Sequence, residues 1–328
     1  MHFLVIGCGS IGQRHIRNLK RLGIRVSACE VDKLKRQEIA EKYNIEAFAG
    51  LKNALKNKFS AALICTPTRL HLPLAIECAR HKIHLFIEKP LSDSLIYVKD
   101  LSEIVKKKKL QVFTACNTRF FPSFKLAKRL LDEGRIGRVL SVRVQCGFYL
   151  PYWHPTEDYR KGYSASRKLG GGVILDDIHE IDSLYWLFGR PSEIFCLATK
   201  ISSLKIDTED IAEITMRFKS GIIAQVHLDY LQRTYRRSYE FIGEDGVIVW
   251  DYINQTVELF TKKVNHRQVF RENINTDRET MFLDEMKHFV NCVESKQKPI
   301  NNLGNAKEIL GIALACHKSA KNKMIVYL

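Results

Sequence analysis

The sequence predicts an α/β protein built from a doubly wound parallel sheet followed by an α/β domain with an open, mainly antiparallel sheet. The length of 328 residues suits about two domains. Over the first 120 residues, short strands that are apolar throughout alternate with helical patterns, which is typical of a parallel sheet covered on both faces. Beyond that point the strands alternate apolar and polar residues, which indicates an antiparallel sheet with one buried face. We therefore expect domains at 1–120 and 121–328, with the C-terminal helix as a candidate to return to the first.

The elements of the first domain follow from apolar runs and from apolar residues at helical spacing. Gly23 ends the first helix, and the pair Thr66-Pro67 stops the third strand. Strands are expected at 3–6, 25–29, 61–65 and 83–87, and helices at 11–22, 33–43 and 72–80.

The second domain begins with a helix at 124–131, which ends at Gly134. Ser220-Gly221 and the segment 243–246 are turn sequences, and each lies between two strands, so two hairpins are expected. The strands are expected at 142–148, 212–218, 222–230, 239–242 and 247–250, and the closing helices at 279–294 and 304–319.

Composition excludes several classes of protein. Hydrophobic residues at 45% and charged residues at 27% rule out wholesale disorder, and no apolar run approaches the length of a membrane helix. The net charge of +16 favours anionic partners, but no helix-turn-helix or RNP-like sequence supports nucleic-acid binding, and 106–109 is interpreted as a solvated helix end. The first residues lack the basic start of a signal peptide, and nine scattered cysteines indicate reduced thiols in a cytoplasmic protein without a zinc site.

A glycine-rich turn follows the first strand. Gly7-Cys8-Gly9-Ser10-Ile11-Gly12 has the spacing G-x-G-x-x-G between a strand and a helix, where backbone amides can hold a pyrophosphate. Glu30 stands 18 positions past Gly12, where a carboxylate accepts hydrogen bonds from a ribose 2′-hydroxyl and repels a 2′-phosphate. The pattern predicts NAD more than NADP, although Lys33 and Arg36 favour the latter. The alternative is a glycine turn without a ligand.

Two further motifs follow predicted parallel strands, and ligands bind at the carboxyl ends of such strands. Thr66-Pro67 begins a segment that runs to His71, and Glu88-Lys89-Pro90 follows the next strand. A lysine there can project its ammonium into a cleft, while the alternative is a surface lysine in a turn. The residues expected to contact the cofactor are Gly7, Gly9, Ser10, Ile11, Gly12, Glu30, Thr66, Pro67, His71, Glu88 and Lys89.

A helix that begins after three glycines, 170–172, carries a histidine among carboxylates. Asp176, His179 and Asp182 are spaced i, i+3, i+6 and share one side of the predicted helix. Carboxylates can fix the tautomer of a histidine and raise its basicity, as general-base catalysis requires. The alternative is a partly buried structural histidine in a charged cluster. A metal site is not predicted, because no second pair of ligands has suitable spacing.

The segment 149–163 combines aromatic and basic residues. Aromatic faces suit sugar rings, and Arg160, Lys161, Arg167 and Lys168 suit a carboxylate or phosphate. The alternative is an exposed basic loop. The residues expected to contact substrate are Arg119, Tyr149, Trp153, Tyr159, Arg160, Asp176 and His179.

Four motifs in order, GCGSIGQRH, TPTRLH, EKP and GGGVILDDIHEID, resemble the Gfo/Idh/MocA family of glucose-fructose oxidoreductase and inositol dehydrogenase type. The resemblance covers the whole chain. It implies a Rossmann domain, a second domain whose open sheet is often used for oligomer contact, a nicotinamide cofactor, and a sugar or cyclitol substrate. The segment 149–163 looks like members tied to nucleotide-sugar or acidic-sugar pathways for surface polysaccharides.

The resemblance also implies residue roles. In the family, the lysine and histidine that correspond to Lys89 and His179 face the substrate carbon beside the nicotinamide. Many members carry an aspartate four residues before that histidine. This chain has Leu175 there and Asp176 three before, as in a shorter D-x-x-H-E-x-D variant.

The expected function is therefore NAD(H)-dependent hydride transfer at a secondary alcohol or ketone of a sugar derivative, by catalytic Lys89, His179 and Asp176. Three alternatives stay open: a glycosidase-type enzyme that oxidises its sugar transiently, a non-catalytic NAD(H)-binding regulator, and a basic nucleic-acid-binding protein. We also expect a homo-oligomer, dimer or tetramer, formed through the sheet face that carries Ile223.

Overall fold

The computed structural model describes residues 1–153, 155, 157–271 and 279–328, apart from the side chains of 264 and 265. The chain divides into two compact units. Unit 1 comprises residues 1–117 and 282–310, and unit 2 comprises residues 118–281 and 311–328. The predicted boundary near residue 120 agrees with the first crossing between the units, but the chain later returns to unit 1 and then to unit 2. The division into domains 1–120 and 121–328 therefore stays a prediction.

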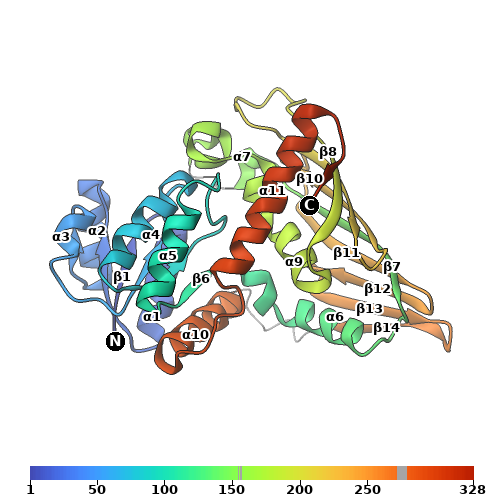
Figure 1. The fold of residues 1–328 in the computed structure, drawn as a ribbon, viewed down its shortest axis with the longest axis horizontal. Helices are drawn as coiled ribbons and strands as arrows, with labels where there is room; N and C mark the ends of the chain where they lie inside the picture. The colour runs from blue at the N-terminus through green and yellow to red at the C-terminus, as the bar shows by residue number, and fades with distance from the viewer. Residues whose placement is uncertain (154, 156, 272–278) are drawn as a thin grey trace. The chain divides into compact units, whose positions relative to one another are not determined.

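Unit 1 contains the predicted parallel sheet (Figure 1). Its strand order is β3-β2-β1-β4-β5-β6, the order 3-2-1-4-5-6 of dinucleotide-binding sheets. The order reverses between β1 and β4, the position at which sheets of this kind bind their ligands. The strands are β1 (His2–Ile6), β2 (Arg25–Cys29), β3 (Ala47–Phe48), β4 (Ala61–Ile64), β5 (His84–Ile87) and β6 (Val112–Thr114).

The helices of unit 1 follow the predicted spacing closely, and α10 from the far end of the chain packs with them. Phe289 of α10 meets Phe3 of β1 at 5.9 Å and Phe86 of β5 at 5.4 Å between ring centroids. These buried rings close one side of the sheet with apolar area that the first 120 residues do not supply. The helices are α1 (Ser10–Arg21), α2 (Lys33–Tyr43), α3 (Leu51–Ala54), α4 (His71–Arg80), α5 (Val98–Lys108) and α10 (Glu279–Ser295), whose residues 279–281 belong to unit 2.

Unit 2 is built on a sheet of nine strands in the order β14-β13-β12-β11-β7-β10-β9-β8-β15. Among the strand pairs that the structure describes, β7 and β10 run parallel and the others antiparallel, as the predicted mainly antiparallel sheet requires. The strands are β7 (Val139–Gly147), β8 (Pro191–Thr199), β9 (Ile211–Phe218), β10 (Ile223–Asp229), β11 (Arg236–Gly243), β12 (Gly246–Asp251), β13 (Thr256–Thr261), β14 (Val264–Arg271) and β15 (Val326–Tyr327).

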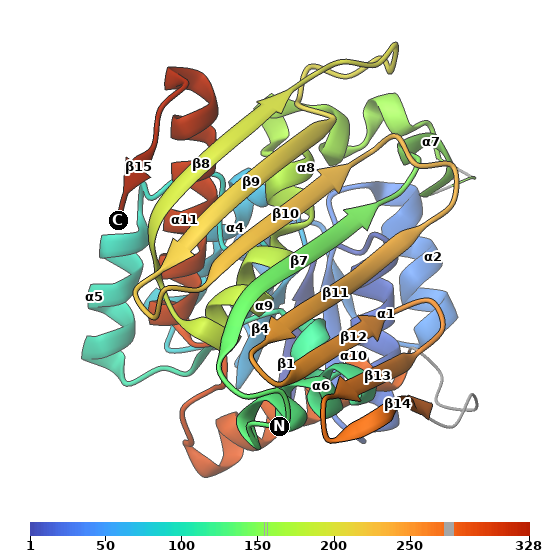
Figure 2. The same ribbon diagram turned by 90° about the vertical axis from the view of Figure 1, so that its right-hand side faces the viewer.

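One face of this sheet is covered by helices of unit 2, and Figure 2 looks onto the other face. Alternation decides which residues meet the helices: Val142, Val144 and Cys146 of β7 are buried, whereas Arg143 and Gln145 between them are exposed. The helices are α6 (Pro122–Asp132), α7 (Leu150–Trp153), α8 (Val173–Asp176), α9 (Ile178–Phe188) and α11 (Leu303–Asn322), whose first turns belong to unit 1. Short 3₁₀ turns lie at 68–70, 117–120, 159–161, 163–165 and 167–169.

All nine cysteines are buried and free. Within the described ranges, no helix is long and apolar enough to cross a membrane.

Candidate functional site

The glycine turn of unit 1 is shaped by backbone contacts. Gly12 lies so close to the carbonyl of Gly7 that a side chain there would overlap it. At Gly9, by contrast, an added Cβ would meet nothing within 4 Å, so the turn leaves open space at its second glycine. The first turn of α1, which begins at Ser10, has neither a side-chain cap nor an acidic residue, so its amides are available to an anion. This arrangement fits the pyrophosphate of a dinucleotide.

Glu30 lies beside this turn at the end of β2. Its two carboxylate oxygens accept hydrogen bonds from the backbone N–H of Cys8 at 2.9 Å and of Asp32 at 3.0 Å. A carboxylate has about four lone-pair positions, so it retains capacity to accept from ribose hydroxyls. Arg36, which favours a phosphate, donates to the carbonyls of Glu30 at 2.9 Å and Val31 at 3.2 Å. Lys33 is exposed.

The loops after β4 and β5 contain the other expected cofactor residues. His71 is 1% exposed, and its two ring nitrogens lie 2.8 Å from the carbonyl oxygens of Thr66 and Pro90. Glu88 is also buried, and its carboxylate contacts Nε2 of His15 at 2.6 Å. Burial would raise the pKa of Glu88, but the hydrogen bond and charge of His15 hold that pKa below its ordinary value. Burial of His71 leaves it no access to a cofactor, whereas contact between Glu88 and a cofactor stays a prediction.

In unit 2, the predicted single helix after the three glycines is wrong in one respect. The helix breaks at Asp177, with φ −93° and ψ 30°, into α8 and α9. Asp176 therefore ends one helix while His179 and Asp182 lie on the next, and the predicted common side of all three does not exist as one helix face. Gly172 has φ +109°, and a side chain there would overlap the carboxylate of Glu209, which explains the glycine before α8.

Asp176 is bound by hydroxyl groups. Its carboxylate accepts hydrogen bonds from Tyr163 Oη, from Ser164 Oγ at 2.6 Å and from Tyr230 Oη at 3.1 Å. Burial and the charge of Asp176 hold the pKa of Tyr230 well above its ordinary value, so this tyrosine stays a donor. Asp176 thus ties the 163–164 segment and the end of β10 to the helix break.

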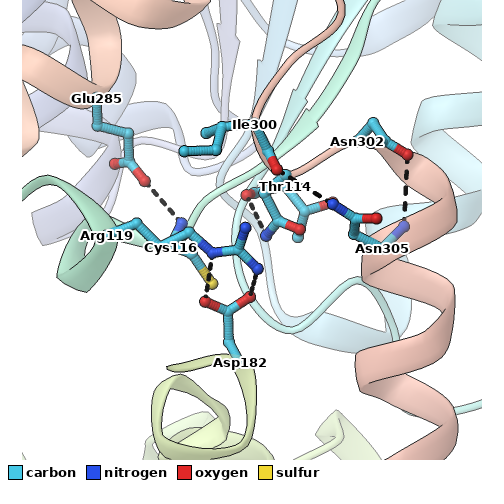
Figure 3. Close-up of polar contacts among 9 residues, drawn as sticks. Thr114, Cys116, Arg119, Asp182, Glu285, Ile300, Asn302 and Asn305 are labelled. Carbon is cyan, nitrogen blue, oxygen red and sulfur yellow. Dashed lines mark hydrogen bonds and ion pairs between the residues drawn. The ribbon is translucent and has the colours of Figure 1, made fainter. Parts of the chain in front are cut away.

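Asp182 and Glu180, on either side of Ile181, are held by arginines. Arg119 binds Asp182 through two hydrogen bonds of 2.8 and 2.7 Å, with side chains 1% and 0% exposed (Figure 3). Glu180 pairs with Arg237 at 2.8 Å and accepts a hydrogen bond from Tyr239. Arg119, expected to contact substrate, and Asp182, considered for orienting the imidazole, therefore form a buried structural pair. His179 itself is half-buried.

The segment 149–163 is only partly described, since His154 and Thr156 lie outside the described residues. Trp153 is 46% exposed and packs on Phe148 at 4.4 Å between ring centroids, and Tyr159 Oη accepts a hydrogen bond from the backbone N–H of Lys205. Arg160 pairs with Asp158 at 2.7 Å on the surface. Exposed aromatic area is present as expected, but Arg160 is already partnered by a carboxylate.

Sequence analysis missed two candidates. The guanidinium of Arg233 lies 3.7 Å above the ring of Tyr149 and donates to Tyr152 Oη at 3.1 Å. Asn117 follows β6 at the carboxyl end of the parallel sheet, and its buried Oδ1 has no hydrogen-bond partner among the described residues. Asn117 could have been predicted from its position after a parallel strand. The stacking of Arg233 on Tyr149 could not, because the two residues are 84 positions apart in the sequence.

No cluster of metal-ligating side chains occurs in the part of the chain that the structure describes.

Comparisons with known proteins cover the whole chain. Residues 1–116 match the family model described as an oxidoreductase family with an NAD-binding Rossmann fold, and residues 124–249 match the GFO/IDH/MocA C-terminal domain. The chain is 30% identical to the myo-inositol 2-dehydrogenase of Thermotoga maritima over 100% of this chain and 98% of the relative. It is 27% identical to the scyllo-inositol 2-dehydrogenase (NAD(+)) of Bacillus subtilis over 99% and 95% of the two chains. A crystal structure of a probable dehydrogenase from Thermotoga maritima has a TM-score of 0.83 and 28% identity, covering 100% and 99%.

Proposed function

The chain belongs to the GFO/IDH/MocA family of NAD-binding oxidoreductases, and from that premise we propose that it transfers a hydride between NAD(H) and a secondary hydroxyl carbon of a sugar or cyclitol. One observation carries the proposal. The chain combines a glycine turn with open space for a pyrophosphate and a half-buried histidine among three carboxylates, Asp176, Glu180 and Asp182, that are bound by the protein.

The roles of the residues follow from the chemistry of alcohol oxidation. NAD, when bound, accepts the hydride. Loss of the hydride requires loss of the hydroxyl proton, and we assign His179 as the base that takes it. We assign Lys89 as the cation that stabilises the developing alkoxide. Asp176, expected as a third catalytic residue, is proposed instead as a positioning residue, because three hydroxyl groups occupy its carboxylate.

We propose a cyclic polyol or sugar as substrate, with an acidic or nucleotide-linked sugar as the narrower class. The full-length relatives named as inositol dehydrogenases support the first part. The net charge of +16 and the exposed aromatic ring of Trp153 support the second.

A substrate screen tests this function. The protein is incubated with NAD⁺ and, separately, inositols, neutral sugars, sugar acids and nucleotide sugars, and the absorbance of reduced nicotinamide is followed. Formation of NADH with at least one polyol is expected. Conversion of a glycoside without net NADH would identify the glycosidase-type alternative, and NAD⁺ binding without turnover of any compound would contradict the proposal.

We also propose that the chain forms a homo-oligomer through the sheet face in Figure 2. Ile223 of β10 is 39% exposed on that face, whereas its neighbour Ala224 is buried on the other. Further exposed apolar side chains on the sheet are Phe195, Leu197, Phe260 and Val269. Light scattering at micromolar concentration should give a dimeric or tetrameric mass, and Ile223→Glu should lower it. A monomeric wild-type protein would contradict this.

A further inference from the structure

Two buried histidines flank the loop that carries Lys89, and the proposed function gives neither a role. His15 lies on α1 and is 0% exposed, and His71 begins α4. Both belong to unit 1, as does Lys89. Burial at this level prevents direct contact with a ligand, so any influence on the reaction passes through the groups that the two rings bind.

His15 acts on the N-terminal side of Lys89. Its Nε2 lies 2.6 Å from one oxygen of Glu88, and the other oxygen of Glu88 accepts the backbone N–H of Lys89 at 3.2 Å. The second ring nitrogen, Nδ1, is buried without a hydrogen-bond partner among the described residues. Leaving a buried nitrogen unpaired costs free energy. The contacts that hold the ring are therefore the one with Glu88 through Nε2 and the packing on Phe86, whose ring centroid lies 4.9 Å away.

His71 acts on the C-terminal side. Its Nδ1 lies 2.8 Å from the carbonyl oxygen of Pro90, the residue after Lys89, and its Nε2 lies 2.8 Å from that of Thr66. Carbonyl oxygens only accept, and a neutral imidazole carries a single N–H. A neutral His71 can therefore donate to one of these carbonyls only, and the contact with Pro90 is the one that bears on Lys89.

We propose that His15 and His71 are positioning residues for Lys89, which they hold from both sides through Glu88 and the Pro90 carbonyl. This inference rests on the proposed role of Lys89 in catalysis. A lysine side chain has several freely rotating bonds, so a fixed backbone on both sides is needed to place its ammonium reproducibly. A displacement of about 1 Å in a reacting group can lower a rate about 100-fold.

Paired substitutions separate the contacts, because the amide nitrogen of asparagine occupies roughly the place of Nδ1 and that of glutamine the place of Nε2. At position 15, His15→Gln keeps the donor to Glu88 and His15→Asn loses it. At position 71, His71→Asn keeps the donor to Pro90 and His71→Gln keeps only the donor to Thr66. Within each pair the ring is lost in both variants, so a general packing defect would affect both members.

The first measurement is hydrogen exchange of the amides of residues 87–89, 91 and 92 in the full chain without ligands, which does not depend on any activity. His15→Asn is expected to exchange about fivefold to tenfold faster at Lys89 than His15→Gln, as loss of one hydrogen bond predicts. Equal exchange in the two variants would overturn the inference even if the enzyme turns over a sugar.

The second measurement is kcat and KM with the substrate from the screen, alongside thermal unfolding. His15→Asn and His71→Gln are expected to lower kcat about 10- to 100-fold relative to their partners, with KM for NAD⁺ within about twofold. Equal kcat within each pair would overturn the inference. If no compound is turned over, the proposed function fails, while the exchange measurement still decides whether His15 holds the loop through Glu88.

Discussion

The glycine turn of unit 1 and the α8–α9 segment of unit 2 differ in which groups form the candidate site, backbone amides in the first and charged side chains in the second. In the turn, backbone amides and the absence of side chains make the site, and Gly9 leaves the space. In α8–α9, charged side chains decide the geometry, and the partners of Asp176, Glu180 and Asp182 come from segments as distant as β11. A backbone-built site is thus local in sequence, whereas a side-chain-built site requires the whole domain.

The largest expected effect is on kcat, and it should distinguish His179 from the carboxylates around it. We expect His179→Ala and Lys89→Ala each to lower kcat about 10²–10⁴-fold, because each removes a group that acts on the proton or the alkoxide. NAD binding, measured by fluorescence, should stay nearly unchanged, and the double variant should be little worse than either single variant. Asp176→Asn should lose far less kcat, since an amide oxygen still accepts from hydroxyls. A near-normal kcat for His179→Ala would show that this histidine is structural.

The next effect concerns stability. Asp182→Ala leaves Arg119 buried without its carboxylate, and we expect the free energy of unfolding to fall by about 3–5 kcal/mol. The double variant Arg119→Met/Asp182→Leu, which removes both charges, should recover most of that loss. Chemical denaturation measures both. A loss below about 1 kcal/mol for Asp182→Ala would contradict the structural role of the pair.

A smaller effect compares two glycines in one turn. Gly12→Ala should destabilise the fold by about 1–3 kcal/mol, because its Cβ would overlap the Gly7 carbonyl. Gly9→Ala should leave the melting temperature unchanged, because nothing in the protein opposes its Cβ. It should instead weaken NADH binding by about tenfold, or ~1.4 kcal/mol. Unchanged NADH affinity in Gly9→Ala would contradict our assignment of the open space at Gly9 as the pyrophosphate site.

The smallest effect concerns the choice between NAD and NADP. Glu30→Ala should relax a preference for NAD, because the carboxylate no longer repels a 2′-phosphate while Arg36 remains beside the end of β2. The ratio of kcat/KM for the two cofactors measures it. A wild-type preference for NADP would show that Arg36 outweighs Glu30.

The same contrast explains how far the sequence alone could predict this molecule. The parallel sheet, both hairpins and the glycine turn were predictable, because their signals are periodicity and spacing within short windows. The break at Asp177 was not, since the apolar spacing from Ile174 to Leu184 continues through it. The roles of Arg119 and Asp176 were not predictable either, because Asp182 lies 63 residues from Arg119 and one of the three partners of Asp176, Tyr230, lies 54 residues away. Packing of α10 against the first sheet depends on Phe289, which no local pattern connects to β1.

Direct hydride transfer is the central claim, and an isotope experiment tests it most directly. Inositols and the other alcohols of the screen, deuterated at their carbinol carbons, are incubated with the protein and NAD⁺, and the recovered NADH is examined by mass spectrometry. The account predicts that at least one alcohol delivers its deuterium to the nicotinamide, and that His179→Ala slows this delivery. Recovery of unlabelled NADH, or of no NADH from any alcohol, would contradict it.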